Sequence, residues 1–200
     1  MTTSFRLAAG AALVLIAACA QAQTPAPAPV PPVTHGPAMT APAPAAAPQA
    51  NPADVASIDS IMAALYDVIS GPVGKQRDWN RFHSLFAPGA RMMAIGMKPD
   101  GTVVHRPMTP AEYVEKNEKG LMDIGFFESE KARTVEQFGE LAHVFTTYEA
   151  RKGSMTAEPF MRGINSVQLI SDGKRWYIAN IIWRAEDAKL KLPARYLQSR

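Results

Sequence analysis

The sequence has a single cysteine, Cys19, and it lies close to the N-terminus. The rest of the chain therefore has no thiol that can form an intrachain disulfide, act as a nucleophile or bind a metal. Histidine is also scarce, and none of the 4 histidines has another histidine or a carboxylate at a recognised ligand spacing. The sequence predicts no metal site, and a folded domain must be held together by packing alone.

An excess of charge of one sign is also lacking. Lys and Arg total 21 against 18 Asp and Glu, which leaves a net charge of +3. A nucleic-acid-binding surface would require clustered Lys and Arg, and the sequence has no such cluster. It also has no phosphate-binding glycine loop, no serine nucleophile elbow and no dinucleotide fingerprint, so no cofactor is predicted.

The N-terminal residues have an export pattern. Arg6 precedes an apolar stretch over residues 7–18, which is shorter than the about 20 apolar residues of a membrane span. Ala20-Gln21-Ala22 fits the small-residue rule for cleavage, so residues 1–22 are predicted to be a signal segment and the protein to be periplasmic or secreted. In the alternative, Ile16 to Cys19 resembles a lipobox, and the protein is a lipoprotein anchored to the membrane at Cys19.

Alanine and proline dominate the next segment, residues 23–52. Proline removes backbone donors and fixes φ, so this composition predicts a disordered, extended linker without helix or sheet. Residues 53–187 are long enough for one domain with a single core. Residues 188–200 have no clear apolar stripe and are predicted to be a C-terminal tail.

Helical signals come first in the predicted domain. Capping residues and apolar spacing predict helices over about residues 52–69, 79–87 and 110–121. Short strands are predicted at 91–97 and 102–106, joined by a turn containing Pro and Gly. The apolar period then changes from helical to alternating, which predicts long strands over residues 126–138, 141–151, 160–171 and 175–186. Helices followed by antiparallel strands indicate an α+β fold in which a strongly bent sheet packs on the N-terminal helices.

Several of these segments resemble the nuclear transport factor 2-like superfamily. They are the helix Ile58–Tyr66, the Trp79–Phe86 segment with Ala87-Pro88-Gly89-Ala90, the strand Ala142–Glu149 and the hairpin Gly173–Ile178. The likeness covers residues 54–186 and is nearest to the polyketide cyclase-like (SnoaL-like) branch of small bacterial domains. The resemblance implies a cone-shaped α+β barrel, often dimeric through the sheet, with a pocket for a small molecule inside the cone. It does not imply one reaction, because fold is weak evidence for chemistry.

Alternation on the last strand places Trp176, Ile178 and Asn180 on one face. Because Trp176 and Ile178 are apolar, this face is predicted to be internal, and Asn180 then points into the cone. Gln168 on the preceding strand is predicted to join Asn180 in a polar cluster, although an amide satisfied by neighbouring backbone is the simpler interpretation. Together with Tyr148, these four residues are the predicted ligand-binding set.

His143 and Glu128 are the candidate catalytic residues. His143 is the only histidine on a long predicted strand, and histidine titrates near neutral pH, although a lone histidine on a strand is more often structural. Glu128 and Glu130 share a face and suit acid–base chemistry only if they are desolvated; the adjacent Lys131 and Arg133 favour a solvent-exposed strand instead.

Two functions remain open at this point. The favoured one is a non-catalytic domain that holds a small apolar or amphipathic molecule in the cone. The alternative is a cofactor-free isomerase, dehydratase or hydrolase that acts on a small organic substrate. An ionisable side chain inside the cone, within hydrogen-bond reach of another polar group, would favour the enzyme.

Overall fold

The structure is a computed structural model, and it describes residues 48–198. The predicted signal segment and most of the predicted linker lie outside the described residues. Within residues 48–198, no helix is long and apolar enough to cross a membrane.

The helices begin where capping residues were predicted, with one difference. The expected first helix is two helices, α1 (Pro52–Val55) and α2 (Ile58–Ile69). Ser57 lies between them in an extended conformation, and its hydroxyl accepts a hydrogen bond from the backbone N–H of Ser60, so α2 has a capping box of its own. The prediction of one continuous helix is therefore wrong at this position, although the apolar stripe it was based on faces the core.

The next helices lie further along the chain. α3 (Trp79–Ser84) is capped by Asp78 and is shorter than predicted. α4 (Pro110–Ile124) starts at the predicted Thr109 capping box and runs about a turn further than predicted, to Gly125 in the left-handed conformation.

Six strands form one open sheet in the order β2-β1-β6-β5-β4-β3. Their bounds are β1 (Phe86–Met97), β2 (Val103–Met108), β3 (Phe126–Phe138), β4 (Leu141–Lys152), β5 (Met161–Ser171) and β6 (Trp176–Ala185). All neighbours are antiparallel except β1 and β6, which are parallel. The predicted α+β class and mostly antiparallel sheet are confirmed, but among the described residues β2 and β3 are the edge strands and do not pair with each other, so the sheet does not close into a barrel.

The start of β1 also differs from the prediction. Pro88-Gly89 was expected to end the preceding helix, but both residues lie inside β1. The pairing of β1 with β6 shifts between Phe86 and Arg91, and Gly89 there has φ 79°. Pro88 and Gly89 lie within this irregular stretch, which the backbone can form because glycine adopts a positive φ without steric cost.

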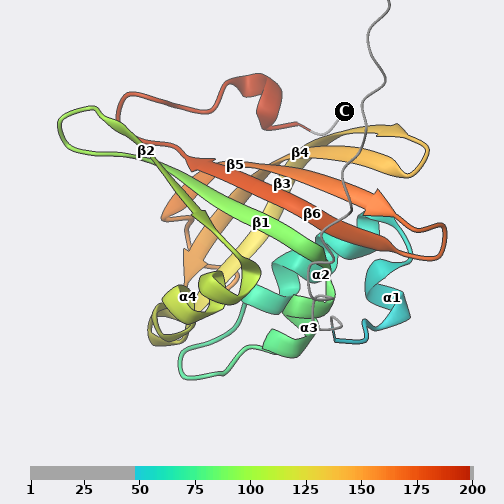
Figure 1. The fold of residues 1–200 in the computed structure, drawn as a ribbon. Coiled ribbons are helices and arrows are strands. Elements are labelled where there is room, and N and C mark those ends of the chain that lie inside the picture. The colour runs from blue at the N-terminus through green and yellow to red at the C-terminus, as the bar shows by residue number, and fades with distance from the viewer. Residues whose placement is uncertain (1–47, 199–200) are drawn as a thin grey trace, which may run out of the picture. The chain divides into compact units, whose positions relative to one another are not determined.

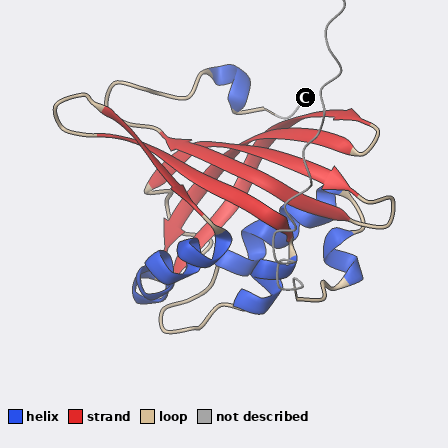
Figure 2. Ribbon diagram, in the orientation of Figure 1, coloured by secondary structure: helices blue, strands red, loops and turns tan. Residues whose placement is uncertain are grey.

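Helices α1 to α4 lie on one face of the sheet, and the segment after β6 lies on the other (Figures 1 and 2). We call these the helix-covered face and the outer face. The core lies between the helices and the helix-covered face, and its fully buried members include Ile61, Met62, Phe82, Leu85, Val144, Val167, Leu169 and Ile178.

On the outer face, the predicted C-terminal tail contacts the sheet. The Thr147 hydroxyl donates a hydrogen bond to the backbone oxygen of Tyr196, in the short helix η1 (Ala194–Tyr196). The Tyr196 ring also lies 5.3 Å from the ring of Phe145. The tail therefore covers part of a face that would otherwise be exposed.

Candidate functional site

A cavity of about 180 Å³ lies between the helix-covered face and helices α2 and α4. Its apolar lining comes from helices and strands alike: Leu65, Ile69, Phe82, Met92, Leu121, Phe126, Met161 and Ile181, with Trp183 at one side. The polar side chains of the lining are Tyr113, Asn117, Glu128, Tyr148 and Asn165. Glu128 is the only carboxylate among them, so it is the one lining group that readily exchanges a proton.

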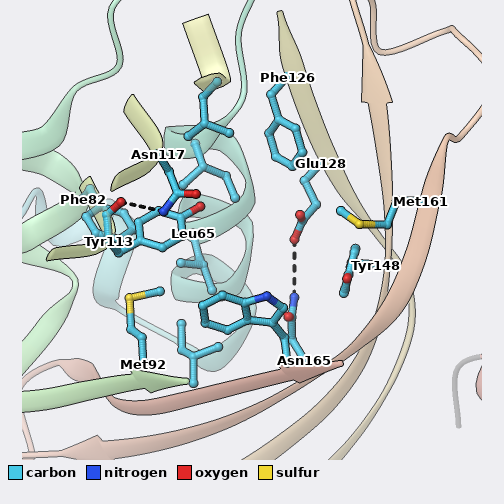
Figure 3. A pocket seen from close by; sticks show the side chains of 14 residues that line it. Leu65, Phe82, Met92, Tyr113, Asn117, Phe126, Glu128, Tyr148, Met161 and Asn165 are labelled. Atoms are coloured by element: carbon cyan, nitrogen blue, oxygen red, sulfur yellow. Dashed lines mark hydrogen bonds between the residues drawn. The ribbon is translucent and has the colours of Figure 1, made fainter. Parts of the chain in front are cut away.

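Glu128 is placed by its neighbours on β3 and by the end of α2. Phe126 and Glu128 are two residues apart on β3, so both side chains face the cavity. The hydroxyl of Ser70, the residue after α2, accepts from the backbone N–H of Glu128 at 2.9 Å and lies 3.2 Å from its backbone oxygen. This contact fixes the backbone of Glu128 against α2, and the side chain points from there toward Asn165 (Figure 3).

Burial raises the pKa of Glu128 to about 7, and a hydrogen bond from Asn165 acts in the opposite direction. The ionised form of a buried carboxyl group lacks the solvation that it has in water, so the protonated form is favoured up to a higher pH. Near neutral pH, Glu128 is then divided between its acid and its base form, which is the condition in which a carboxyl group best transfers protons.

Asn165 connects Glu128 to a second buried group. Its amide nitrogen lies 3.4 Å from Glu128 Oε1 and 3.3 Å from the phenol oxygen of Tyr66. Tyr66 in turn lies 3.1 Å from the hydroxyl of Thr146, which is fully buried on β4. An ionisable group therefore lies inside the fold within reach of another polar group.

Two further phenols line the cavity, from opposite sides. Tyr113 comes from α4 and stacks on Phe82 with the ring centroids 5.5 Å apart. Tyr148 comes from β4 and is 2% exposed. Burial holds the pKa of both phenols above their usual range, so both remain hydrogen-bond donors at neutral pH.

The structure divides the predicted ligand-binding set between the two faces. Tyr148 lines the cavity, whereas Asn180 and Gln168 lie outside it. Asn180 pairs with Gln168, but the next pair is Ile178 with Leu169, so Ala179 is an extra residue in β6. This bulge reverses the alternation in β6, so Asn180 points to the outer face, where unbroken alternation on β5 also places Gln168. The expectation that they meet inside the cone is corrected.

Trp176 and Ile178 precede that bulge and do face the helices. Ile178 is fully buried, and its backbone N–H donates to the backbone oxygen of Leu85 at 2.9 Å. Neither residue lines the cavity. Beyond the bulge, Ile181 and Trp183 are the β6 residues whose side chains line it. Their contribution in the structure is to the core beside α3.

His143 lies on the outer face, away from the cavity. Its Nε2 is 3.0 Å from the hydroxyl of Ser166, and its Nδ1 is 4.0 Å from the carboxylate of Glu136, whose side chain is 81% exposed. Glu128 and His143, the two candidate catalytic residues, are therefore on opposite faces of the sheet. Within residues 48–198, no cluster of three or more His, Cys, Asp or Glu side chains is arranged to hold a metal.

Sequence reasoning missed Asn165, Thr146 and Trp183 as members of this site. Asn165 and Gln168 are three residues apart on β5, so their side chains point to opposite faces of the sheet. The prediction that Gln168 points into the cone therefore placed Asn165 outside it. The available signal was an asparagine among Gly163, Val167 and Leu169, because an amide on an apolar face needs a partner inside.

No protein-family model and no curated protein matches the sequence. Among solved structures, a protein of unknown function with a cystatin-like fold from Nostoc punctiforme PCC 73102 has a TM-score of 0.50 and 9% identity, covering 66% of this chain and 90% of that one. An NTF-2 like protein of unknown function from Silicibacter pomeroyi DSS-3 has a TM-score of 0.42 and 13% identity, covering 66% of this chain and 94% of that one.

A nuclear transport factor 2 (NTF2-like) superfamily protein from Salmonella enterica serovar Typhimurium LT2 has a TM-score of 0.43 and 12% identity, with 68% of this chain and 89% of that one covered. The Silicibacter and Salmonella structures are described as NTF2-like, and this chain is similar to them at TM-scores below 0.5. The Nostoc protein shows that the fold is α+β and cystatin-like. At these identities the likeness concerns the fold alone.

Proposed function

We propose that the cavity binds a small, mainly apolar organic molecule with a carbonyl group, and that Glu128 moves a proton to and from the carbon next to that group. The single observation that carries this proposal is a carboxyl group facing an apolar cavity, with a pKa raised by burial to about 7. Such a reaction needs only acid–base groups, and isomerisation and dehydration are both of this kind.

The phenols supply the second half of the chemistry. When Glu128 takes a proton from the carbon next to a carbonyl, the electron pair of the broken C–H bond moves to the carbonyl oxygen. Tyr113 and Tyr148 are donors lining the same cavity, and a hydrogen bond from either would stabilise the charge on that oxygen. Returning the proton from Glu128 to the same carbon gives proton exchange, and returning it to another carbon of a conjugated enolate gives an isomer; either step restores the carboxylate of Glu128.

The size of the cavity limits the substrate. An apolar cavity of roughly 150 Å³ holds a benzene molecule, and this one has about 180 Å³. The substrate class is therefore a molecule with about one ring, or a short branched chain, with one polar end near Glu128 and Asn165.

A non-catalytic binding domain is the second candidate, and the apolar character of most of the lining favours it. The two candidates predict different behaviour of the Glu128→Gln variant. In a binding domain, a neutral glutamine keeps the shape and binds the ligand at least as well. In the enzyme, it removes the group that accepts the proton.

The test is hydrogen–deuterium exchange into cyclohexanone and acetophenone in D₂O, followed by proton NMR. We expect the wild-type protein to speed loss of the protons next to the carbonyl, and Glu128→Gln to show only the rate of buffer. If the wild-type protein also shows the buffer rate while both ketones raise its melting temperature, the binding domain stands and the enzyme is rejected.

Export and self-association are further proposals that rest on the sequence and its resemblance. We propose that the protein leaves the cytoplasm through its N-terminal segment and forms a homodimer through the sheet. Mass spectrometry of the protein from its native host, which reads the N-terminus or a lipid on Cys19, tests the first. Light scattering on the purified protein tests the second.

A further inference from the structure

A chain of hydrogen bonds connects Glu128 with a second carboxylate at the edge of the helix-covered face. Glu130 Oε1 accepts from the hydroxyl of Thr146 at 2.6 Å, and that hydroxyl lies 3.1 Å from the phenol oxygen of Tyr66. The amide nitrogen of Asn165 lies 3.3 Å from the same phenol oxygen and 3.4 Å from Glu128 Oε1. The three middle residues are buried, with exposed fractions of 0% for Thr146, 6% for Tyr66 and 7% for Asn165.

While Glu130 is ionised, the hydrogen bonds of this chain can run in only one direction from donor to acceptor. A carboxylate accepts hydrogen bonds and cannot donate them, so the single hydroxyl proton of Thr146 is directed to Glu130. The Thr146 oxygen must then accept from Tyr66, whose own oxygen accepts from Asn165. The amide of Asn165 is thereby held with its NH₂ group toward Tyr66 and Glu128.

Arg133 maintains the charge at the outer end of the chain. Its guanidinium lies 3.5 Å from Glu130 Oε2 and 2.5 Å from Asp59 on α2. The Glu130 side chain is 25% exposed, so it contacts water as well as Arg133. Glu130 therefore differs from Glu128, whose polar contact within the fold is Asn165.

We propose that Glu130 is a positioning residue for Glu128: its carboxylate sets the direction of the chain through Thr146 and Tyr66, and so fixes the Asn165 amide with its N–H toward Glu128. The inference rests on the proposed role of Glu128 in proton transfer. Glu130 is not among the residues that line the cavity. It acts through three residues, and its effect is on the balance between the two protonation states of Glu128.

The opposite direction of the chain defines what Glu130 prevents. If Thr146 donates to Tyr66 and Tyr66 donates to Asn165, the amide turns and presents its oxygen to Glu128. An oxygen next to Glu128 repels the carboxylate and accepts a hydrogen bond from the carboxylic acid. The reversed chain therefore favours protonated Glu128, and the chain held by Glu130 favours the ionised form.

The expected shift in the pKa of Glu128 is opposite in sign to the shift that removal of the Glu130 charge would cause by itself. Removing the negative charge of Glu130 by itself lowers the pKa of a neighbouring carboxyl group, because a like charge has been removed. Releasing the direction of the chain raises the pKa of Glu128 instead. Glu128 and Glu130 also line a groove beside the cavity. The variants tested leave the other titratable or charged groups of the cavity and this groove unchanged: Tyr66, Tyr113, Tyr148, Asp59, Asp67 and Arg133.

The test is the titration of Glu128 in the purified protein, followed by carbon NMR of the glutamate carboxyl groups, with the Glu128→Gln spectrum as the assignment. Glu130→Gln keeps the shape of the side chain but offers a donor and an acceptor, so the direction is no longer imposed. Thr146→Val keeps the Glu130 charge and removes the hydroxyl, and Thr146→Ser is the matched control that keeps it. No substrate is needed, so the result is independent of whether ketone exchange is found.

We expect the midpoint of Glu128 to rise by about half a pH unit or more in Glu130→Gln and in Thr146→Val, as the loss of one hydrogen bond to a charged group predicts. Thr146→Ser should titrate as the wild type does. A fall or no change in Glu130→Gln overturns the proposal, as does a rise there with no change in Thr146→Val. If Thr146→Val does not fold, the sign of the shift in Glu130→Gln decides alone, because charge removal and release of the chain move the midpoint in opposite directions.

Discussion

The two faces of the sheet carry similar polar side chains in different surroundings. On the helix-covered face, Glu128 and Asn165 line a cavity closed by α2 and α4. On the outer face, His143 and Ser166 form a comparable pair 3.0 Å apart, but the histidine side chain is 33% exposed. The covered pair contains a carboxyl group, Glu128, whose pKa burial raises to about 7. The mostly apolar lining around Glu128, which His143 does not share, distinguishes the candidate site from the pair on the outer face.

The largest expected difference is in the rate of ketone proton exchange when the ionisable residue on each face is replaced by glutamine. Glu128→Gln should reduce the rate of ketone proton exchange by about 100-fold or more, since a positioned base contributes about 10²- to 10⁴-fold. His143→Gln should leave the rate within about twofold of the wild type, because His143 lies on the far side of the sheet from the cavity. Equal losses in both variants, measured by the same NMR assay, would remove the functional distinction between the faces.

The pH dependence of stability sharpens the comparison next. Burial raises the pKa of Glu128 to about 7 from its usual value of 4.5, so between these values the folded state holds more protons than the unfolded state. Stability linked to Glu128 is then fully present below about pH 4.5 and is lost as the pH rises to about 7. Glu128→Gln should remove this loss and be more stable than the wild type at pH 8 by at most about 3 kcal/mol, with little difference at pH 4.5.

Urea unfolding of both proteins at the two pH values measures the difference. Glu136→Gln is the matched control, because the Glu136 side chain is 81% exposed beside His143. Its free energy of unfolding should change by less than about 0.5 kcal/mol at either pH. A Glu128→Gln variant that is no more stable at pH 8 than at pH 4.5, relative to the wild type, would mean that Glu128 is solvated.

Packing differs between the faces as well. A Cβ at Gly163 would lie 2.7 Å from the phenol oxygen of Tyr148 and 2.7 Å from the Cα of Ala185, so the covered face has no room for a methyl group there. Gly163→Ala should cost about 2 kcal/mol of unfolding free energy through overpacking. Ser166→Ala on the outer face removes one partly exposed hydrogen bond and should cost about 1 kcal/mol or less. Thermal unfolding ranks the two, and the reverse order would contradict this account.

The sequence predicted the order of the elements and the long strands because caps and alternation are local signals. β3 has the predicted bounds, and the Thr109 capping box starts α4 as expected. Tyr148 was predicted to contact a ligand, and it lines the cavity, although its role remains a proposal. These successes depend on side chains whose direction follows from unbroken periodicity.

The rest was missed because two bulges change which residues face the cavity. The first lies between Glu130 and Ala132, and it turns Arg133 toward α2, where it pairs with Asp59. Arg133 had been counted as evidence that the strand is exposed, so Glu128 was assigned to solvent. The second lies at Ala179 and moves Asn180 to the outer face. Neither bulge contains a glycine or a proline, so the sequence has no local signal for either.

The smallest expected effect concerns the tail on the outer face. The Tyr196 ring packs 5.3 Å from Phe145, and a space of about 390 Å³ remains between the tail and the sheet. Tyr196→Ala should lower the free energy of unfolding by about 1 kcal/mol, since it removes one aromatic pair while the backbone oxygen that accepts from Thr147 is kept. Lys191→Ala, at an exposed position of the same tail, should change it by less than about 0.5 kcal/mol. Both variants should retain the full rate of Glu128-dependent exchange, because the sheet separates the tail from the cavity. A Tyr196→Ala protein that is normally stable but exchanges ketone protons more slowly would show that the two faces are coupled, and the division between them would then have to be abandoned.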